Sequence, residues 1–203
     1  MPANKNPRTG KGNSQTFGTL TRAPIGLADE ARRASVKALT QLLVDTITLR
    51  DLYKKHHWQV SGPTFYSLHL LYDKHFDEQH KLVDLIGERI QILGGVAPAM
   101  AHDVAEATSI ERPPKDSESV PAQLARLLAA HEKILVGARR AATESSDLGD
   151  YGTNDLLVSA MIPTNEMQVW FIGEHLVPQT LVVQPEQAAE GPTPYESSPE
   201  QNA

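Results

Sequence analysis

The stretch from His57 to Gly95 restricts the fold more than any other part of the chain, because it sets potential metal ligands at helical spacing. The turn Ser61-Gly62-Pro63-Thr64 separates one apolar-periodic segment from a second that continues to about Leu93, with Thr64 as the expected N-cap. Gly94-Gly95 then supplies a C-terminal stop. Because the joint is short, the two segments are expected to pack as an antiparallel pair of long helices.

Four potential ligands follow one face of the second helix. At about 100° per residue, with His69 at zero, Asp73 lies at about 40°, Asp84 at about 60° and Glu88 at about 100°. Asp73 and Asp84 are nevertheless about 16 Å apart along the axis, at about 1.5 Å per residue. Since a metal–ligand bond is only about 2 Å long, one straight helix cannot bring both pairs to one ion.

Two arrangements are open for these ligands. The His69/Asp73 pair and the Asp84/Glu88 pair can serve different sites, or one site can be shared between two copies of the chain. A two-fold axis between antiparallel copies of this helix would set each first pair against the second pair of the partner, which favours a site across a dimer interface. Taken singly, each pair is also explained by an ordinary contact along a helix.

Composition limits the chemistry of any metal site. The chain of 203 residues has a net charge of −6 and no cysteine, which excludes thiolate zinc sites, disulfides and iron–sulfur clusters. A metal must therefore be held by His and carboxylate. The mild acidity argues against a nucleic-acid-binding surface over the whole body. Without a signal peptide or an apolar run of membrane-spanning length, a cytoplasmic protein is expected.

The remaining apolar periodicity predicts an all-α protein, a four-helix bundle over residues 25–176. The first helix spans about 27–60, the third about 120–145 and the fourth about 154–176, with a kink at Pro163. The connection 96–119 is long enough for a crossover and is expected to contain a short extra helix near 102–108. Residues 177–203 hold five of the fourteen prolines and four glutamates, and are predicted to form an acidic tail.

A basic arm precedes the bundle. Residues 1–24 have no acidic side chain, and their positive charges come from Lys5, Arg8, Lys11 and Arg22. Two interpretations are open: a solvated tail without a partner, or an arm that binds nucleic acid without sequence preference.

Together these motifs resemble the signature of the Dps family, the DNA-binding proteins from starved cells or mini-ferritins. The resemblance rests on His57-Trp58, Gly62-Pro63, His69-x-x-x-Asp73, Asp84-x-x-x-Glu88-Arg89 and Gly94-Gly95, and covers about residues 27–176. It implies a hollow dodecamer whose ferroxidase centres take His57, His69 and Asp73 from one subunit, and Asp84 and Glu88 from its two-fold mate. Trp58 is expected to pack against the bundle, with sacrificial electron donation as the alternative.

The chain departs from familiar members of the family in a few places. Asp77 and His80 are additional candidate ligands on the same stripe, and His75 lies beside them. Asn165 with Glu166 replaces a His-Glu pair. The other histidines outside the motif are expected to be ordinary core or surface residues.

The resemblance implies the function as well. Fe(II) would be oxidised, preferentially by hydrogen peroxide, and stored as ferric mineral, with Zn(II) or Mn(II) as competitors for the same nitrogen and oxygen ligands. Iron would enter through acidic three-fold pores, for which the candidates are Asp147, Asp150 and Asp155. The alternative function is a DNA-compacting, nucleoid-associated shell with a silent or zinc-occupied site, in which many basic arms act together.

Overall fold

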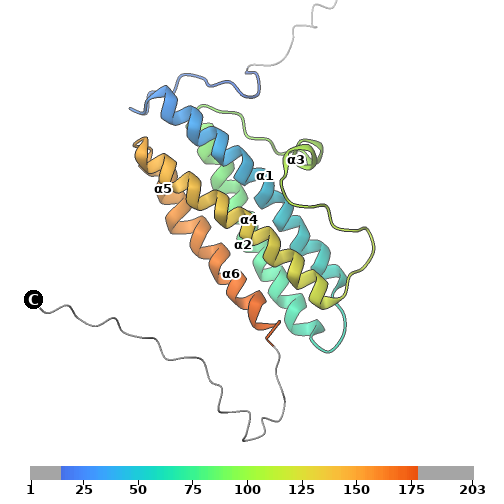
Figure 1. Cartoon of the computed structure of the whole chain (residues 1–203). Coiled ribbons are helices and arrows are strands. Elements are labelled where there is room, and N and C mark those ends of the chain that lie inside the picture. The colour runs from blue at the N-terminus through green and yellow to red at the C-terminus, as the bar shows by residue number, and fades with distance from the viewer. Residues whose placement is uncertain (1–14, 178–203) are drawn as a thin grey trace, which may run out of the picture.

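The computed structural model describes residues 15–177, and Figure 1 shows that they form a bundle of long helices. The elements are α1 (Asp29–Gln59), α2 (Phe65–Ile92), α3 (Ala101–Ala107), α4 (Val120–Asp147), α5 (Tyr151–Leu156), the π-helical turn η1 (Leu157–Met161) and α6 (Ile162–Glu174). The described part contains no strand, so the all-α prediction is confirmed. None of its helices is both long and apolar enough to cross a bilayer.

Helix α1 is the centre of the packing, because it lies against both α2 and α4. Leucine and isoleucine side chains at helical spacing point inward from each helix and form one core, among them Leu39, Leu49, Leu68, Ile86 and Leu127, all completely buried. Burying a side chain of this size contributes about 1.5–3 kcal/mol. The first two helices are joined by the predicted short turn, although the side chain of Thr64 makes no capping hydrogen bond among the described residues.

The fourth helix of the bundle is built from three pieces. It begins earlier than predicted, at Tyr151, because the Asp150 side chain caps it by accepting a hydrogen bond from the Thr153 backbone N–H. Pro163 has no N–H to donate and its ring crowds the preceding turn. The wider π turn from Leu157 to Met161 ends two residues before this proline and accommodates it, close to the place where the sequence predicts a kink.

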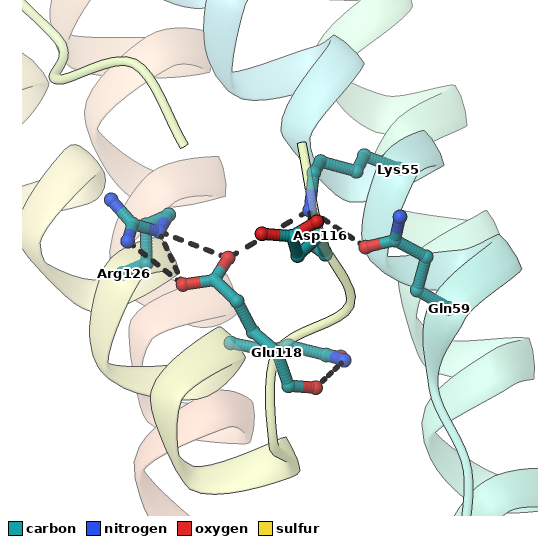
Figure 2. Close-up of polar contacts among 6 residues, drawn as sticks. Lys55, Gln59, Asp116, Glu118 and Arg126 are labelled. Carbon is teal, nitrogen blue, oxygen red and sulfur yellow. Dashed lines mark hydrogen bonds and ion pairs between the residues drawn. The ribbon is translucent and has the colours of Figure 1, made fainter. Parts of the chain in front are cut away.

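The long connection between α2 and α4 is fastened to the bundle at two places. At the first, the buried Asp45 carboxylate of α1 accepts hydrogen bonds from Thr108 and Ser109, just after α3. Figure 2 shows the second, where Glu118 forms an ion pair with Arg126 of α4 at 2.8 Å and another with Lys55 of α1 at 3.8 Å. These contacts hold a crossover connection in place although most of it is not helical.

Candidate metal centre

Two histidines face each other across the α1–α2 turn. His57, in the last turn of α1, stacks on His69, in the first turns of α2, with ring centroids 3.7 Å apart. His57 Nδ1 donates to the His69 backbone carbonyl at 2.8 Å, and His69 Nδ1 donates to the His57 carbonyl at 2.9 Å. A carbonyl oxygen can only accept, so Nδ1 of each ring carries a proton. Nε2 of each ring is therefore the nitrogen that can bind a metal ion.

Asp73 lies one turn further along α2, beside this histidine pair. Its Oδ1 is 3.9 Å from His57 Nδ1, and its carboxylate forms an ion pair with Lys54 of α1. The hydrogen bond from Lys54 lowers the pKa of Asp73 below its ordinary value, and the lysine charge acts in the same direction. Asp73 is thus ionised and half-exposed, with a cation already beside it.

Asp84 and Glu88 lie on the far half of α2, where both side chains are exposed. They border a shallow groove of about 670 Å³ whose other walls are mostly apolar, with Leu43, Ile47 and Ile92 among them. Carboxylates on the rim of an apolar groove are a surface that a second copy could cover.

The predicted ligands of one chain do not form a complete site. His57, His69 and Asp73 come together, whereas Asp84 and Glu88 lie along the same straight helix, about 16 Å from Asp73. Even these three neighbours are not gathered closely enough to hold an ion by themselves, and within residues 15–177 no other three His, Asp or Glu side chains are. The additional candidates Asp77 and His80 are exposed on the same stripe.

One of the three acidic pore candidates requires a correction. Asp147, at the end of α4, and Asp155, in α5, are both exposed. Asp150 is only 1% exposed, and its carboxylate accepts hydrogen bonds from Thr153 and forms an ion pair with Arg89. A carboxylate enclosed in this way cannot line a water-filled passage, so the prediction for Asp150 is wrong and its role is to start α5.

Trp58 and the basic arm are the remaining predicted features. Trp58 is 75% exposed, so it does not pack against the bundle of its own chain. The reason is helical geometry: His57 faces α2, and the next residue points about 100° away. Of the arm, Arg22 is exposed at the surface, whereas Lys5, Arg8 and Lys11 lie outside the described residues, as do residues 178–203 of the acidic tail.

Lys54 is a residue of the site that the sequence did not predict. Nothing in the local pattern distinguishes this lysine from Lys55, its neighbour, because the partner Asp73 belongs to another helix. Only the antiparallel register of α1 and α2 reveals that an ammonium group is bound to a predicted ligand.

Comparisons with known proteins agree with this architecture. The family model of the ferritin-like domain matches residues 36–179. The structure of DpsC from Streptomyces coelicolor is similar to this chain, with 50% identity, a TM-score of 0.83, and coverage of 84% of this chain and 99% of that one. A Dps homologue from Halobacterium salinarum superposes with a TM-score of 0.81 at 27% identity, covering 86% and 97% of the two chains. A nutrient stress-induced DNA-binding protein from Nostoc is 34% identical over 75% of this chain and 83% of its own length.

Proposed function

Because the chain belongs to the Dps family of ferritin-like proteins, we propose that it oxidises Fe(II) with hydrogen peroxide and stores the ferric product inside a hollow dodecamer. The observation that carries the proposal is the reciprocal hydrogen bonding of His57 and His69. The hydrogen bonds occupy Nδ1 of each ring and leave Nε2 of each as the nitrogen that can bind a metal ion, and Asp73 Oδ1 lies 3.9 Å from His57 Nδ1.

The centre is shared between two copies in this proposal. His57, His69 and Asp73 of one subunit bind Fe(II), and Asp84 and Glu88 of the partner subunit complete the ligand set. Within one chain the two ligand pairs are too far apart along α2 to share an ion. When two α2 helices lie antiparallel around a two-fold axis, the first pair of one copy faces the second pair of the other. The apolar groove beside Asp84 and Glu88 would then be covered by the partner.

Each residue has a defined task in the oxidation. The two imidazoles bind Fe(II), and the carboxylates stabilise the additional positive charge as it becomes Fe(III). Two Fe(II) ions give one electron each to one hydrogen peroxide, whose O–O bond breaks as both oxygens leave as water or hydroxide. Lys54 must leave Asp73 before a metal ion can bind to this carboxylate. The ion pair therefore competes with weakly bound cations for Asp73.

Iron would reach the interior past Asp147 and Asp155, because exposed carboxylates near the α4–α5 turn attract cations. Zn(II) and Mn(II) prefer similar nitrogen and oxygen ligands and are the expected competitors.

Loading with Fe(II) without oxygen, followed by peroxide, tests the proposal. Rapid ferric absorbance and retained iron are expected from the wild type, and also from His102→Ala, which replaces an exposed histidine outside the site. His57→Ala should lose the rapid phase. Absence of ferric product from the wild type would refute the ferroxidase function.

Mixing two inactive variants tests the sharing of the centre. A hybrid assembled from His57→Ala and Asp84→Ala subunits contains some interfaces in which all intact ligands meet, so part of the activity should return. A mixture of His57→Ala with His69→Ala is the matched control, because both changes damage the same half of the site. Recovery in neither mixture would contradict a centre built from two copies.

DNA binding is the second candidate function, supported by the printed names of relatives such as the Nostoc protein and by the basic residues 1–24. Several arms on one assembly would add their weak phosphate contacts, and the contacts would be sensitive to salt. In this function the protein is a compacting shell associated with the nucleoid, and its metal site can hold zinc.

A further inference from the structure

The core of the bundle contains a polar cluster that the metal centre does not use. It draws on all four long helices and consists of Tyr53 from α1, His75 and Gln79 from α2, His131 from α4, and Asn165 and Gln168 from α6. All six side chains are completely buried. Buried polar groups are costly unless they are hydrogen-bonded, so the direction of each bond in the cluster is informative.

The chemistry of the partners determines those directions. Asn165 donates from its amide nitrogen to the Met161 carbonyl, so its Oδ1 is the atom that faces His131 Nδ1 at 2.8 Å. An oxygen of this kind only accepts, and His131 therefore carries its proton on Nδ1 and a lone pair on Nε2. His131 Nε2 lies 2.5 Å from the oxygen of the Tyr53 hydroxyl, so the hydroxyl must donate its proton to this nitrogen.

The same logic assigns the other neighbour of Tyr53. Because the phenol gives its single proton to His131, the contact between Tyr53 and His75 Nδ1 at 3.2 Å requires His75 to be the donor. The hydroxyl oxygen thus accepts from one imidazole and donates to another. Burial lowers the pKa of His131 to about 4, so at neutral pH this ring is neutral and its Nε2 accepts the hydrogen bond from Tyr53.

Tyr72 provides an internal comparison. Its ring lies 6.0 Å from that of Tyr53 and is also fully buried, yet its hydroxyl has no hydrogen-bond partner in the described part of the chain. Burial raises the pKa of both phenols above the ordinary value. Tyr53 has a base within hydrogen-bond reach, whereas Tyr72 has no such base among the described residues.

Tyr53 is also close to the proposed iron centre. It precedes His57 by one turn of α1, about 6 Å along the axis, and its neighbour Lys54 binds Asp73. An electron that leaves the phenol therefore has a short path along one helix to the ligands.

We propose that Tyr53 is a redox-active tyrosine that supplies the second electron to peroxide when only one Fe(II) occupies the centre, passing its proton to His131. This role rests on the proposed ferroxidase function. Fe(II) gives one electron and Tyr53 the other; with two protons from solvent, hydrogen peroxide becomes two waters. The products are Fe(III), a neutral tyrosyl radical and the imidazolium of His131. The next Fe(II) returns an electron to the radical, the proton returns from His131, and a second Fe(III) forms.

The surroundings of Tyr53 suit this chemistry. In the oxidised pair, the phenoxyl oxygen accepts from both His131 and His75, and the imidazolium donates its other proton to Asn165. The pair is thus hydrogen-bonded in both states without movement of a helix. Such an electron source matters when iron is scarce, because one-electron reduction of peroxide releases a hydroxyl radical.

Electron paramagnetic resonance of iron-limited protein tests the proposal. Full-length protein receives fewer Fe(II) ions than it has centres, then peroxide, and is frozen. The wild type should give a neutral tyrosyl signal, and Tyr72→Phe, the matched control, should keep it. Tyr53→Phe should lose the signal and release more spin-trapped hydroxyl radical, but only when iron is limiting. A signal that survives in Tyr53→Phe, or a tryptophanyl signal from Trp58, would overturn the assignment.

Two further measurements separate this inference from its premise. Ferric absorbance with excess iron reports the ferroxidase reaction directly, and it should be nearly unchanged in Tyr53→Phe. In iron-free protein, a photogenerated one-electron oxidant should produce the same Tyr53 radical, which His131→Gln should abolish because an amide is no base. Circular dichroism and assembly size show whether the variants fold. Ferric product without a tyrosyl radical would reject the proposed role of Tyr53 but not the ferroxidase function.

Discussion

Replacement of Asp150 should destabilise the fold far more than replacement of the other two acidic residues near the α4–α5 turn. Its carboxylate is enclosed, forms an ion pair with Arg89, and accepts two hydrogen bonds from Thr153, at 3.0 Å from the backbone N–H and 2.7 Å from the hydroxyl. Burial opposes its ionisation, but the neighbouring Ser35, the hydrogen bonds from Thr153 and the Arg89 charge together outweigh burial and keep the pKa below the ordinary value.

The magnitude follows from the two roles of this carboxylate. Removing one partner of a buried ion pair costs about 3–5 kcal/mol, and the lower end applies here because the Arg89 side chain is still 17% exposed. Asp150→Asn keeps an acceptor for Thr153 and should therefore lower the free energy of unfolding by about 3 kcal/mol. Asp150→Ala also removes the helix cap and should cost about 1 kcal/mol more.

Thermal unfolding at a fixed protein concentration measures the effect. For a domain of this size, 3 kcal/mol corresponds to a fall in Tm of roughly 6–12 °C. Asp147→Asn and Asp155→Asn are the controls; both residues are exposed, so stability should change by less than about 0.5 kcal/mol. The Asp150→Asn difference should shrink as the pH falls below about 4, because a carboxylate with a depressed folded pKa loses its contribution there.

A double-mutant cycle gives the decisive result. If the ion pair causes the loss, Arg89→Met combined with Asp150→Asn should be less destabilised than the sum of the two single changes. Strict additivity, or an Asp150→Asn variant as stable as the wild type, would refute this account of the buried pair.

Three further predictions concern other parts of the molecule. Lys54→Met should tighten anaerobic Zn(II) binding by up to about fivefold in calorimetry, because a part-exposed ion pair is worth at most about 1 kcal/mol; weaker binding would contradict the competition between Lys54 and the metal for Asp73. The pKa of His131 is about 4 in the folded chain, so as the pH falls the unfolded chain binds a proton at this residue before the folded chain does. This difference should make the protein about 2 kcal/mol less stable at pH 5 than at pH 7.5. In urea unfolding, His131→Gln should lose less stability between these two pH values than the wild type. Deletion of residues 1–22 should weaken DNA binding and flatten its salt dependence in gel shifts, and unchanged shifts would exclude the arm.

The helices and the ligand stripe could be predicted from the sequence because both depend on local spacing. Apolar residues at periods near 3.6 mark the long helices, and Gly62-Pro63 and Gly94-Gly95 mark two of their limits. The axial distance between Asp73 and Asp84 follows from helix rise alone, and so does the conclusion that one chain cannot complete the site. The bounds of the fourth helix were less predictable, because the cap of Asp150 depends on a contact that no periodicity records.

What each side chain touches was decided only by the tertiary structure. The pairing of Lys54 with Asp73, the burial of Asp150 under Arg89, and the 2.5 Å contact between Tyr53 and His131 all join residues on different elements, far apart in the chain. Periodicity states which face of a helix a residue occupies, but the register and rotation of neighbouring helices set which groups meet across it. For this protein the sequence determined which face of α2 carries the candidate ligands. The packing of the helices decided that Asp150 is the enclosed carboxylate and that Tyr53 is the phenol with a base beside it.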